Sequence, residues 1–310
     1  MKNLLTTLLI VLTATFASAQ TTDTAAMDST TADTVSYWKT GGKFTTLFNQ
    51  TSLTNWAGGG QSSLSLASNF EYFANYADGK KSWQNNISGS YGINEIKGEE
   101  TRKTQDYLEI NSKYGRNISP LWSLSGFATV QSQFTPGYNY ENDPEGTNYI
   151  SNFFAPGYVL EGIGFEYNLP DQGFSFTISP LTVKHTFVMD EGVKATDYGL
   201  DSGETVRTEV GAYLKIDYKK TIAEHINFSS NLLLYSNYIE KPENVDVNWK
   251  NEVTLKVNKW LSVNFIAHFI YDDDVKFEET EEIGGVTVIN SRGPRLQIRQ
   301  VTGLGISFIW

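Results

Sequence analysis

Histidine is the residue type in this sequence with the widest catalytic use, because its imidazole can act as a general base near neutral pH. The 310 residues contain three, His185, His225 and His268. They lie far apart, and no serine near them lies in an evident nucleophile motif. Isolated histidines are evidence of catalysis only when geometry supports it. The sequence therefore predicts a non-enzymatic protein with no catalytic residue, no cofactor and no metal site.

An acidic segment could bind a divalent cation through its carboxylate oxygens. It begins with Asp272, Asp273 and Asp274 and continues with the glutamates between Glu278 and Glu282. The segment lacks the glycine and the ligand spacing of a calcium loop. We therefore expect a solvated acidic loop here.

Three consecutive glycines, Gly58 to Gly60, have the composition of a phosphate cradle. Such a loop needs a following Lys and Ser/Thr, or a helix whose N-terminal amides face the anion. Instead, Leu64, Leu66, Phe70 and Tyr72 follow at every second or fourth position, which is the pattern of a strand with one apolar face. The glycines are expected to turn a β-hairpin.

The elements that would position any of these side chains are strands. Alternation of apolar and polar residues recurs from Gly42 to the last residue, and no segment holds an apolar stripe of helical period. In the segment 247–257, for example, Val247, Trp249 and Val253 share one face, and charged or polar side chains share the other. The sequence therefore predicts an all-β protein.

Twelve segments show this alternation, and each is long enough to cross a membrane. Ten residues at about 3.3 Å each, tilted by about 40°, rise about 25 Å. Short turns alternate with long loops, as in single-chain outer-membrane barrels that keep both termini on the periplasmic side. We predict a transmembrane antiparallel β-barrel of about 12 strands. The predicted strands are 42–54, 62–77, 82–95, 105–117, 121–135, 154–168, 173–188, 205–219, 225–239, 246–258, 260–272 and 295–310.

The N-terminal segment has the pattern of an exported protein. Residues 1–19 carry Lys2, an apolar run over residues 4–16 and small residues before the expected cleavage site, which predicts a secretory signal peptide. Residues 20–38 are Thr, Ala and Asp with little apolar mass, so they are expected to be a disordered periplasmic leader. Residues 39–310 would form the outer-membrane barrel.

Composition agrees with this assignment. The chain has no cysteine, so the barrel must be stable without disulfides. Its formal net charge of −11 makes nucleic acid an improbable partner, because the phosphate backbone binds basic surfaces. The expected partners are outer-membrane lipid, the barrel assembly machinery and small solutes.

The last strand carries the strongest local signal. Leu304, Ile306, Phe308 and the terminal Trp310 share one face. This pattern resembles the terminal strand that the outer-membrane assembly machinery recognises in barrel proteins. We predict that these four residues are the assembly signal.

If the apolar faces contact lipid, the opposite faces line the lumen. Their charges have two interpretations: a cross-strand lattice of salt bridges that fills the barrel, or a narrow pore whose Arg and Lys select anions or sugars. The main predicted lumen residues are Arg207, Glu209, Lys250, Glu252, Lys256, Arg295 and Arg299, and the same reading adds Glu71, Asn94, Glu109, Lys113, Lys215 and Asp217.

Several roles remain open at this point. The leading hypothesis is a non-enzymatic narrow channel or a closed structural barrel, and the second is a surface binding or assembly role of the long loops. Lipid hydrolysis is the third, because outer-membrane phospholipases are twelve-stranded barrels with a Ser-His-Asn set on the outer face. His225 falls beside a turn, His268 is expected to face inward, and His185 follows Pro180, where a bulge could change the face. Soluble barrels and β-sandwiches are disfavoured, because the polar opposite faces suit a lumen.

The stretch "KFTTLFNQTSLTNWAGGGQSSLSLASNFEYFANY", followed by "WQNNISGSYG" and "YLEINSKYGRNIS", resembles domain-of-unknown-function family 3078, outer-membrane-type barrels of the Bacteroidota. The resemblance implies a β-barrel in the outer membrane and carries no reaction, since the family has no established activity. It is most specific at Asn55, Trp56, Ala57, Gly58, Gly59 and Gly60.

Overall fold

The computed structural model describes residues 36–53, 61–140, 143, 145–283 and 286–310, and the side chains of 278–292 are not described. The predicted signal peptide, almost all of the predicted leader and the Asn55–Gly60 motif lie outside these residues. The first strand, β1, begins at Trp38, the last residue that the sequence assigned to the leader. Among the described residues, no helix combines the length and the apolar composition needed to cross a bilayer.

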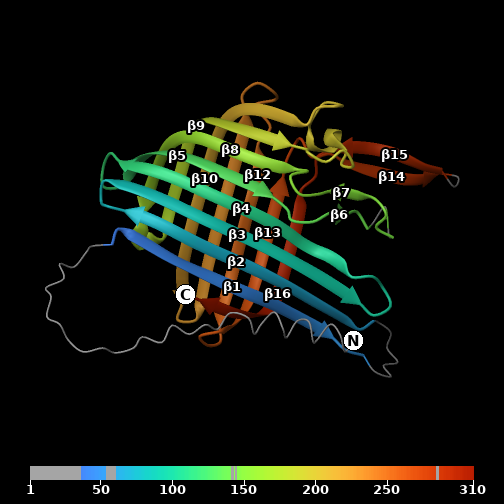
Figure 1. Cartoon of the computed structure of the whole chain (residues 1–310), viewed down its shortest axis with the longest axis horizontal. Helices are drawn as coiled ribbons and strands as arrows, with labels where there is room; N and C mark the ends of the chain where they lie inside the picture. The colour runs from blue at the N-terminus through green and yellow to red at the C-terminus, as the bar shows by residue number, and fades with distance from the viewer. Residues whose placement is uncertain (1–35, 54–60, 141–142, 144, 284–285) are drawn as a thin grey trace, which may run out of the picture. The chain divides into compact units, whose positions relative to one another are not determined.

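Twelve antiparallel strands form a closed barrel, as the sequence predicts. Each strand pairs with its neighbours in chain order, and β1 closes the sheet against β16, so the barrel has no free edge (Figure 1). The barrel strands are β1 (Trp38–Thr51), β2 (Ser63–Ala77), β3 (Lys81–Ile96), β4 (Arg102–Asn117), β5 (Trp122–Ser132), β8 (Gly157–Leu169), β9 (Phe174–Phe187), β10 (Val206–Ala223), β11 (Ile226–Asn237), β12 (Asp246–Lys256), β13 (Leu261–Tyr271) and β16 (Gln297–Ile309).

The remaining strands lie in two of the long loops. The β5–β8 loop contains the short pair β6 (Gly137–Tyr138) and β7 (Tyr149–Ser151), and the β13–β16 loop contains the hairpin β14 (Phe277–Ile283) and β15 (Val286–Gly293). Both pairs lie at the same end of the barrel (Figure 1). The sequence predicted long connections in both places, and these short strands were not among the predicted twelve. Each pair forms a separate two-stranded sheet within its connection, so the barrel itself keeps twelve strands.

The outer and inner faces of the barrel differ in the way that the alternation predicts. Large apolar side chains are exposed on the outside, among them Phe44, Ile87, Leu124, Trp249 and Phe308. The fully buried side chains inside are small and polar: Ser125, Ser179, Thr182 and Asn264. An apolar exterior around a polar interior is the arrangement of a membrane-spanning β-barrel.

Aromatic rings gather on the outside near the end of the barrel that carries the short turns. Trp122 contacts Tyr167 and Phe176 with ring centroids 5.0 and 5.6 Å apart, and Trp38 contacts Tyr76 at 5.5 Å. These residues come from five strands, so they form part of a belt. Aromatic belts lie at membrane–water boundaries, which places this boundary near the short turns.

The C-terminal residue helps to close the sheet. The Gly42 N–H donates to the Trp310 carbonyl at 3.0 Å, and the Trp310 N–H donates to the Gly42 carbonyl at 3.1 Å. A Cβ on Gly42 would clash with the Trp310 ring, so glycine leaves the space that the ring occupies. The stacking of Trp310 on Phe70 at 6.3 Å extends this contact to β2.

One irregularity decides which way β9 presents its side chains. Pairing with both neighbours shifts between Ser179 and Thr182, where β9 holds one extra residue beside Pro180. Ile178 and Leu181 are consequently both exposed, while Ser179 and Thr182 are both buried. Above this bulge the even-numbered residues of β9 face the lumen, and below it the odd-numbered residues do.

The long loops pack against each other and form a cap with its own apolar cluster. Ala155, Val188, Val193 and Leu200 are buried together, with the 3₁₀ turn η2 (Ala195–Tyr198) against them. Asp190 ties the cap by accepting hydrogen bonds from Asn152 Nδ2 at 2.6 Å, Tyr149 Oη at 3.0 Å and the Gly192 N–H at 2.8 Å. These bonds, led by the one from Asn152, hold the pKa of Asp190 below its ordinary value.

Candidate functional site

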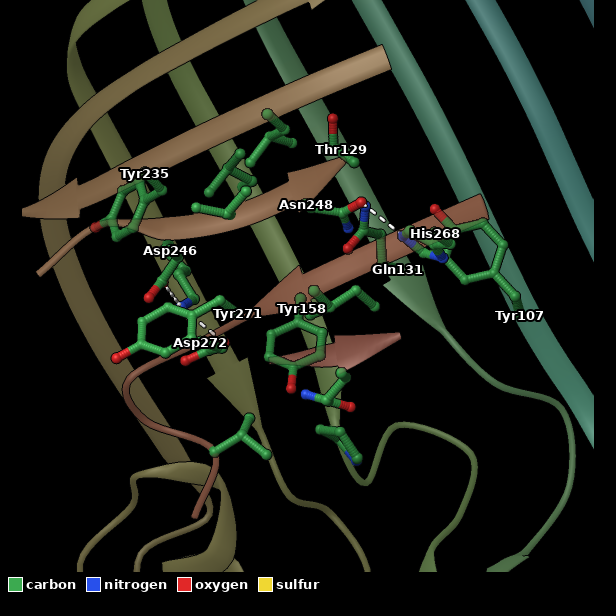
Figure 2. A pocket seen from close by; sticks show the side chains of 18 of the residues that line it. Tyr107, Thr129, Gln131, Tyr158, Tyr235, Asp246, Asn248, His268, Tyr271 and Asp272 are labelled. Carbon is green, nitrogen blue, oxygen red and sulfur yellow. Dashed lines mark hydrogen bonds and ion pairs between the residues drawn. The ribbon is translucent and has the colours of Figure 1, made fainter. Parts of the chain in front are cut away.

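A cavity of about 290 Å³ occupies the lumen at the end that carries the long loops (Figure 2). Its wall is built from side chains at the loop-side ends of most of the barrel strands. Pro156 and Val275, from two of the loops, also line it. The labelled wall residues in Figure 2 are Tyr107, Thr129, Gln131, Tyr158, Tyr235, Asp246, Asn248, His268, Tyr271 and Asp272.

Hydroxyls, amides and tyrosine rings make up much of the wall. Tyr107, Tyr158, Tyr235 and Tyr271 supply rings and hydroxyls, and Gln131 and Asn248 supply amides. The Tyr235 hydroxyl is buried without a hydrogen-bond partner among the described residues. Such a wall combines apolar ring faces with hydrogen-bonding groups, which is the usual composition of a site for a small polar molecule.

Lys184 is the central charge of the cavity wall. Its ammonium lies 2.8 Å from Asp246 Oδ2, 3.6 Å from Asp272 Oδ2 and 3.8 Å from Glu209 Oε2. It also lies over the Tyr235 ring, 5.3 Å from the centroid. The residue keeps only 8 % exposure, so the surrounding carboxylates offset the cost of burying its charge.

Arg207 extends this cluster toward the loops. Its guanidinium lies 2.7 Å from Asp274 Oδ1, 2.7 Å from Glu240 Oε2 and 3.3 Å from Glu209 Oε1. Glu209 therefore joins the two basic residues, and two of the predicted lumen residues, Arg207 and Glu209, are in direct contact. Together, the basic pair faces five carboxylates, which leaves this end of the lumen with an excess of negative charge.

The three consecutive aspartates are held by basic side chains from different elements. Asp272 meets Lys184 of β9, Asp274 meets Arg207 of β10, and Asp273 Oδ2 lies 3.2 Å from Lys241 in the β11–β12 loop. Burial alone would raise the pKa of Asp273, but the hydrogen bond from Lys241 and the charge of Lys276 outweigh it, so this pKa lies below its ordinary value. The expectation of a solvated loop was wrong for these residues.

Below the cavity, two aromatic rings meet on one side of the lumen wall. Phe127 of β5 and Tyr213 of β10 have ring centroids 4.8 Å apart and ring planes tilted by 30°, and only β8 and β9 separate their strands. Arg299 of β16 donates from Nη1 to Gln105 Oε1 of β4 at 2.7 Å. Phe127 lies two positions further from the loops than Thr129 of the cavity wall. The two rings therefore narrow one side of the lumen beneath the cavity. The Arg299–Gln105 bond lies at the height of the cavity wall, because Arg299 pairs with the wall residue His268 and Gln105 precedes the wall residue Asp106.

The other predicted lumen residues are scattered. Lys250 and Glu252 line a small void of about 30 Å³ with Lys43 and Glu71, away from the Lys184 cluster. Lys256 is the last residue of β12 and is exposed, and Arg295 is exposed in the segment before β16. The predicted set therefore does not form one site.

The histidines separate into different environments. His268 faces the lumen, with Nε2 2.8 Å from Asn248 Oδ1, and His225 lies exposed at the β10–β11 turn. His185, above the β9 bulge, faces outward. The same bulge turns Lys184 inward. The sequence analysis missed Lys184 because its face depends on the bulge, and Pro180 was the available signal.

Two family models match separate parts of this chain. Residues 48–138 match the family model DUF3078 and residues 169–283 match DUF481, both described as proteins of unknown function. The predicted resemblance to family 3078 is confirmed for residues 48–138, which is less of the chain than the sequence suggested. No curated protein matches the chain.

Several solved structures are similar in fold, at low identity. The COG4313 outer membrane channel from Pseudomonas putida F1 is 11 % identical, with 90 % of this chain and 100 % of that chain covered and a TM-score of 0.40. The translocator domain of the autotransporter NalP from Neisseria meningitidis is 8 % identical, with 88 % of each chain covered and a TM-score of 0.33. The TodX monoaromatic hydrocarbon channel deltaS2 mutant is 7 % identical, covering 87 % and 89 %, with a TM-score of 0.26.

Proposed function

We propose that this protein is an integral outer-membrane barrel that acts as a narrow channel for small neutral or cationic polar solutes. The observation that carries the proposal is the cavity of about 290 Å³ in the lumen, directly above the Phe127–Tyr213 contact. The apolar exterior and the aromatic belt support a membrane location.

The charges of the cavity argue against selection of anions. Lys184 and Arg207 would attract an anionic solute, but each is already engaged by three carboxylates. Rings of acidic side chains favour cations in channels. A neutral solute with hydroxyl groups or a small organic cation therefore suits this wall better than the anions that the sequence alone left open.

The narrowness of the channel follows from bulky side chains on the lumen wall below the cavity. Phe127 of β5 and Tyr213 of β10 contact each other over β8 and β9, with ring centroids 4.8 Å apart. Both rings occupy space on this side of the lumen, so their removal should widen the passage below the cavity.

Planar-bilayer recording on the mature protein tests this function. The wild type should show small conductance steps, and the Phe127→Ala/Tyr213→Ala double variant should show larger steps, because both rings are removed from the lumen wall. A salt gradient should give a reversal potential of cation-selective sign. A matched control, Phe44→Ala, removes an aromatic from the outer face and should leave the conductance unchanged.

Two outcomes would contradict the proposal. One is a double variant that is folded, as judged by heat-dependent gel mobility, but as silent as a bilayer without protein. The other is a reversal potential of anion-selective sign.

A surface binding role is the second candidate, and the packed cap favours it. Ala155, Val188, Val193 and Leu200 give the loops a defined shape, which a partner needs for specific recognition. Co-purification from native membranes should retain a partner with the wild type and lose it when residues 190–203 are replaced by a glycine-serine linker.

A further inference from the structure

A second polar cluster lies outside the lumen, on the outer face of β8, β9 and β10. The β9 bulge turns His185 outward, where its ring lies beside Thr208 of β10 and Glu161 of β8. His185 Nδ1 is 2.8 Å from Thr208 Oγ1, and His185 Nε2 is 3.9 Å from Glu161 Oε1. The imidazole therefore has a hydroxyl on one side and a carboxylate on the other.

The surroundings of this cluster are apolar and accessible. The exposed side chains nearby on the same outer face are Ile163, Leu181 and Val206. Glu161 is itself 57 % exposed at its side chain, so it faces lipid rather than the lumen. An ionisable residue on the lipid face of a barrel costs most at the bilayer midplane and little near the boundary, so the height of the cluster on the barrel decides what it can meet.

The height of the cluster matches the polar boundary of the outer leaflet. The aromatic belt at the other boundary includes Phe176, which is on the same strand as His185 and nine residues before it. Because the bulge adds one residue to β9, the paired strand β8 advances eight residues between these two positions. At about 3.3 Å per residue and a tilt of about 40°, His185 lies about 20 Å above Phe176, within about 5 Å of the apolar thickness of about 25 Å. The ester groups of membrane lipids lie at this boundary.

The arrangement is that of an activated nucleophile. A hydroxyl within hydrogen-bond distance of an imidazole, which a third group orients, is the general signature of nucleophilic catalysis. Thr208 supplies the hydroxyl, His185 the base and Glu161 the carboxylate that stabilises a protonated imidazole. Each comes from a different strand of a rigid sheet, so their spacing is fixed by the barrel.

The backbone of Thr208 offers a donor for a developing negative charge. Tyr238 N–H donates to the Val210 carbonyl at 2.9 Å, and the pairing of β10 with β11 begins at Gly211. The backbone groups of successive residues in a strand point to alternate neighbouring strands, so the Thr208 N–H points to the same side as the Val210 carbonyl, toward β11. Thr208 lies beyond Gly211, where the pairing of β10 with β11 begins. The N–H of the nucleophilic residue is one of the two oxyanion donors in serine proteases.

We propose that Glu161, His185 and Thr208 form a lipid-facing site that hydrolyses acyl esters of membrane lipids. Thr208 Oγ1 attacks the ester carbonyl carbon and passes its proton to His185 Nδ1. The bond to the lipid alkoxide then breaks, the alkoxide takes that proton and leaves as the deacylated lipid, and the acyl chain stays on Thr208. Water attacks this acyl ester, with His185 again as base, and releases a fatty acid and free Thr208.

The Glu161–His185–Thr208 cluster is independent of the channel, since it does not contact the lumen. Of the three histidines, His185 is the one placed to meet a lipid ester. His268 is bonded to Asn248 inside the barrel and His225 lies at a turn, so neither can meet a lipid ester at this boundary. The prediction of a non-enzymatic protein rested on the lack of a serine motif, whereas Thr208 reaches His185 from the neighbouring strand.

The test is fatty-acid release by the full mature protein reconstituted into vesicles. One arm uses phosphatidylethanolamine and phosphatidylglycerol, and the other adds an acylated saccharide lipid, so the two sources of acyl ester are distinguished. We expect turnover in at least one arm. His185→Asn and Thr208→Val should each lose about 10²- to 10⁴-fold in rate, the range for removing a base or a nucleophile. Thr208→Ser should retain activity.

Two further measurements keep the test decisive. Mass spectrometry of the Glu161→Gln variant should find an acyl group on the peptide that contains Thr208. Thr46→Val removes another threonine that is paired with a serine on the outer face, and it should leave turnover unchanged. Release no faster than from protein-free vesicles in both arms overturns the proposal, as does equal release by the folded wild type and Thr208→Val.

Discussion

Lys184 and His185 are adjacent in the chain, yet they belong to opposite surfaces of the barrel. Lys184 faces the lumen with 8 % exposure and contacts three carboxylates, whereas His185 faces outward with a hydroxyl and one distant carboxylate. The difference shows that the carboxylates around Lys184 hold its ammonium in place inside the barrel, whereas the outward-facing ring of His185 is accessible to another molecule. Burial, rather than residue type, separates the structural cluster from the reactive one.

The largest expected effect comes from breaking the inner cluster. Lys184→Met should lower the free energy of unfolding by about 3–5 kcal/mol, because it leaves Glu209, Asp246 and Asp272 close together without their shared cation. Guanidinium unfolding in detergent, followed by tryptophan fluorescence, measures the change. A loss below about 1 kcal/mol would mean that water, and not Lys184, stabilises these carboxylates.

The contact between the loop and the barrel should have the next largest effect. Asp274→Asn weakens the 2.7 Å contact with Arg207, and it should cost about 1–2 kcal/mol, the lower part of the range for charged hydrogen bonds, because Asp274 keeps 25 % side-chain exposure. Hydrogen exchange of residues 270–276 should accelerate by about tenfold. Lys194→Ala, at an exposed ion pair of the same cap, is the control and should change little.

Acid should loosen the cap before it affects the barrel. The pKa values of Asp190 and Asp273 lie below their ordinary values in the folded state, so each stabilises the cap above the unfolded pKa of about 3.9 and loses this contribution as pH falls through the folded pKa. Protease cleavage of the loops should be constant from pH 7 to about 5 and should increase below about pH 4. Increased cleavage already at pH 6 would contradict this assignment.

The smallest effect is expected from the outer cluster. His185→Ala removes one hydrogen bond of a partly exposed side chain, so it should cost about 1 kcal/mol or less in unfolding free energy. The unfolding assay used for Lys184→Met also measures the loss of unfolding free energy for His185→Ala, so the inner and outer faces of β9 can be compared directly. If His185→Ala were as destabilising as Lys184→Met, the outer cluster would be structural, and its proposed reactivity would lose its basis.

The fold was predictable because the evidence for it is local. Each strand carries its own alternation, as Val247, Trp249 and Val253 show, and Trp310 ends the last strand with its ring on the outer face. Twelve such segments with alternating connection lengths are enough to specify a closed barrel. The hairpin β14–β15 was missed because it forms a separate two-stranded sheet within a connection and is not part of the barrel wall.

The candidate sites were only partly predictable. The alternation correctly placed Arg207 and Glu209 on one face of β10, but alternation alone does not identify their ion-pair partners. It also grouped Lys250, Lys256 and Arg295 with them, although these three residues lie in regions that share no cavity. For β9 the rule fails at Pro180, where one extra residue exchanges the two faces. Lys184 and His185 both lie beyond this point.

The sequence by itself determined a cysteine-free chain of alternating strands, because hydrophobic periodicity and composition are properties of neighbouring residues. Only the tertiary structure decided that Lys184 meets Asp246 and Asp272, that Phe127 contacts Tyr213 over two intervening strands, and that Thr208 reaches His185. These contacts depend on strand register, bulge position and barrel closure. Each is set by hydrogen bonds between strands that are distant in the sequence, and a single-residue shift in any of them would exchange lumen and lipid.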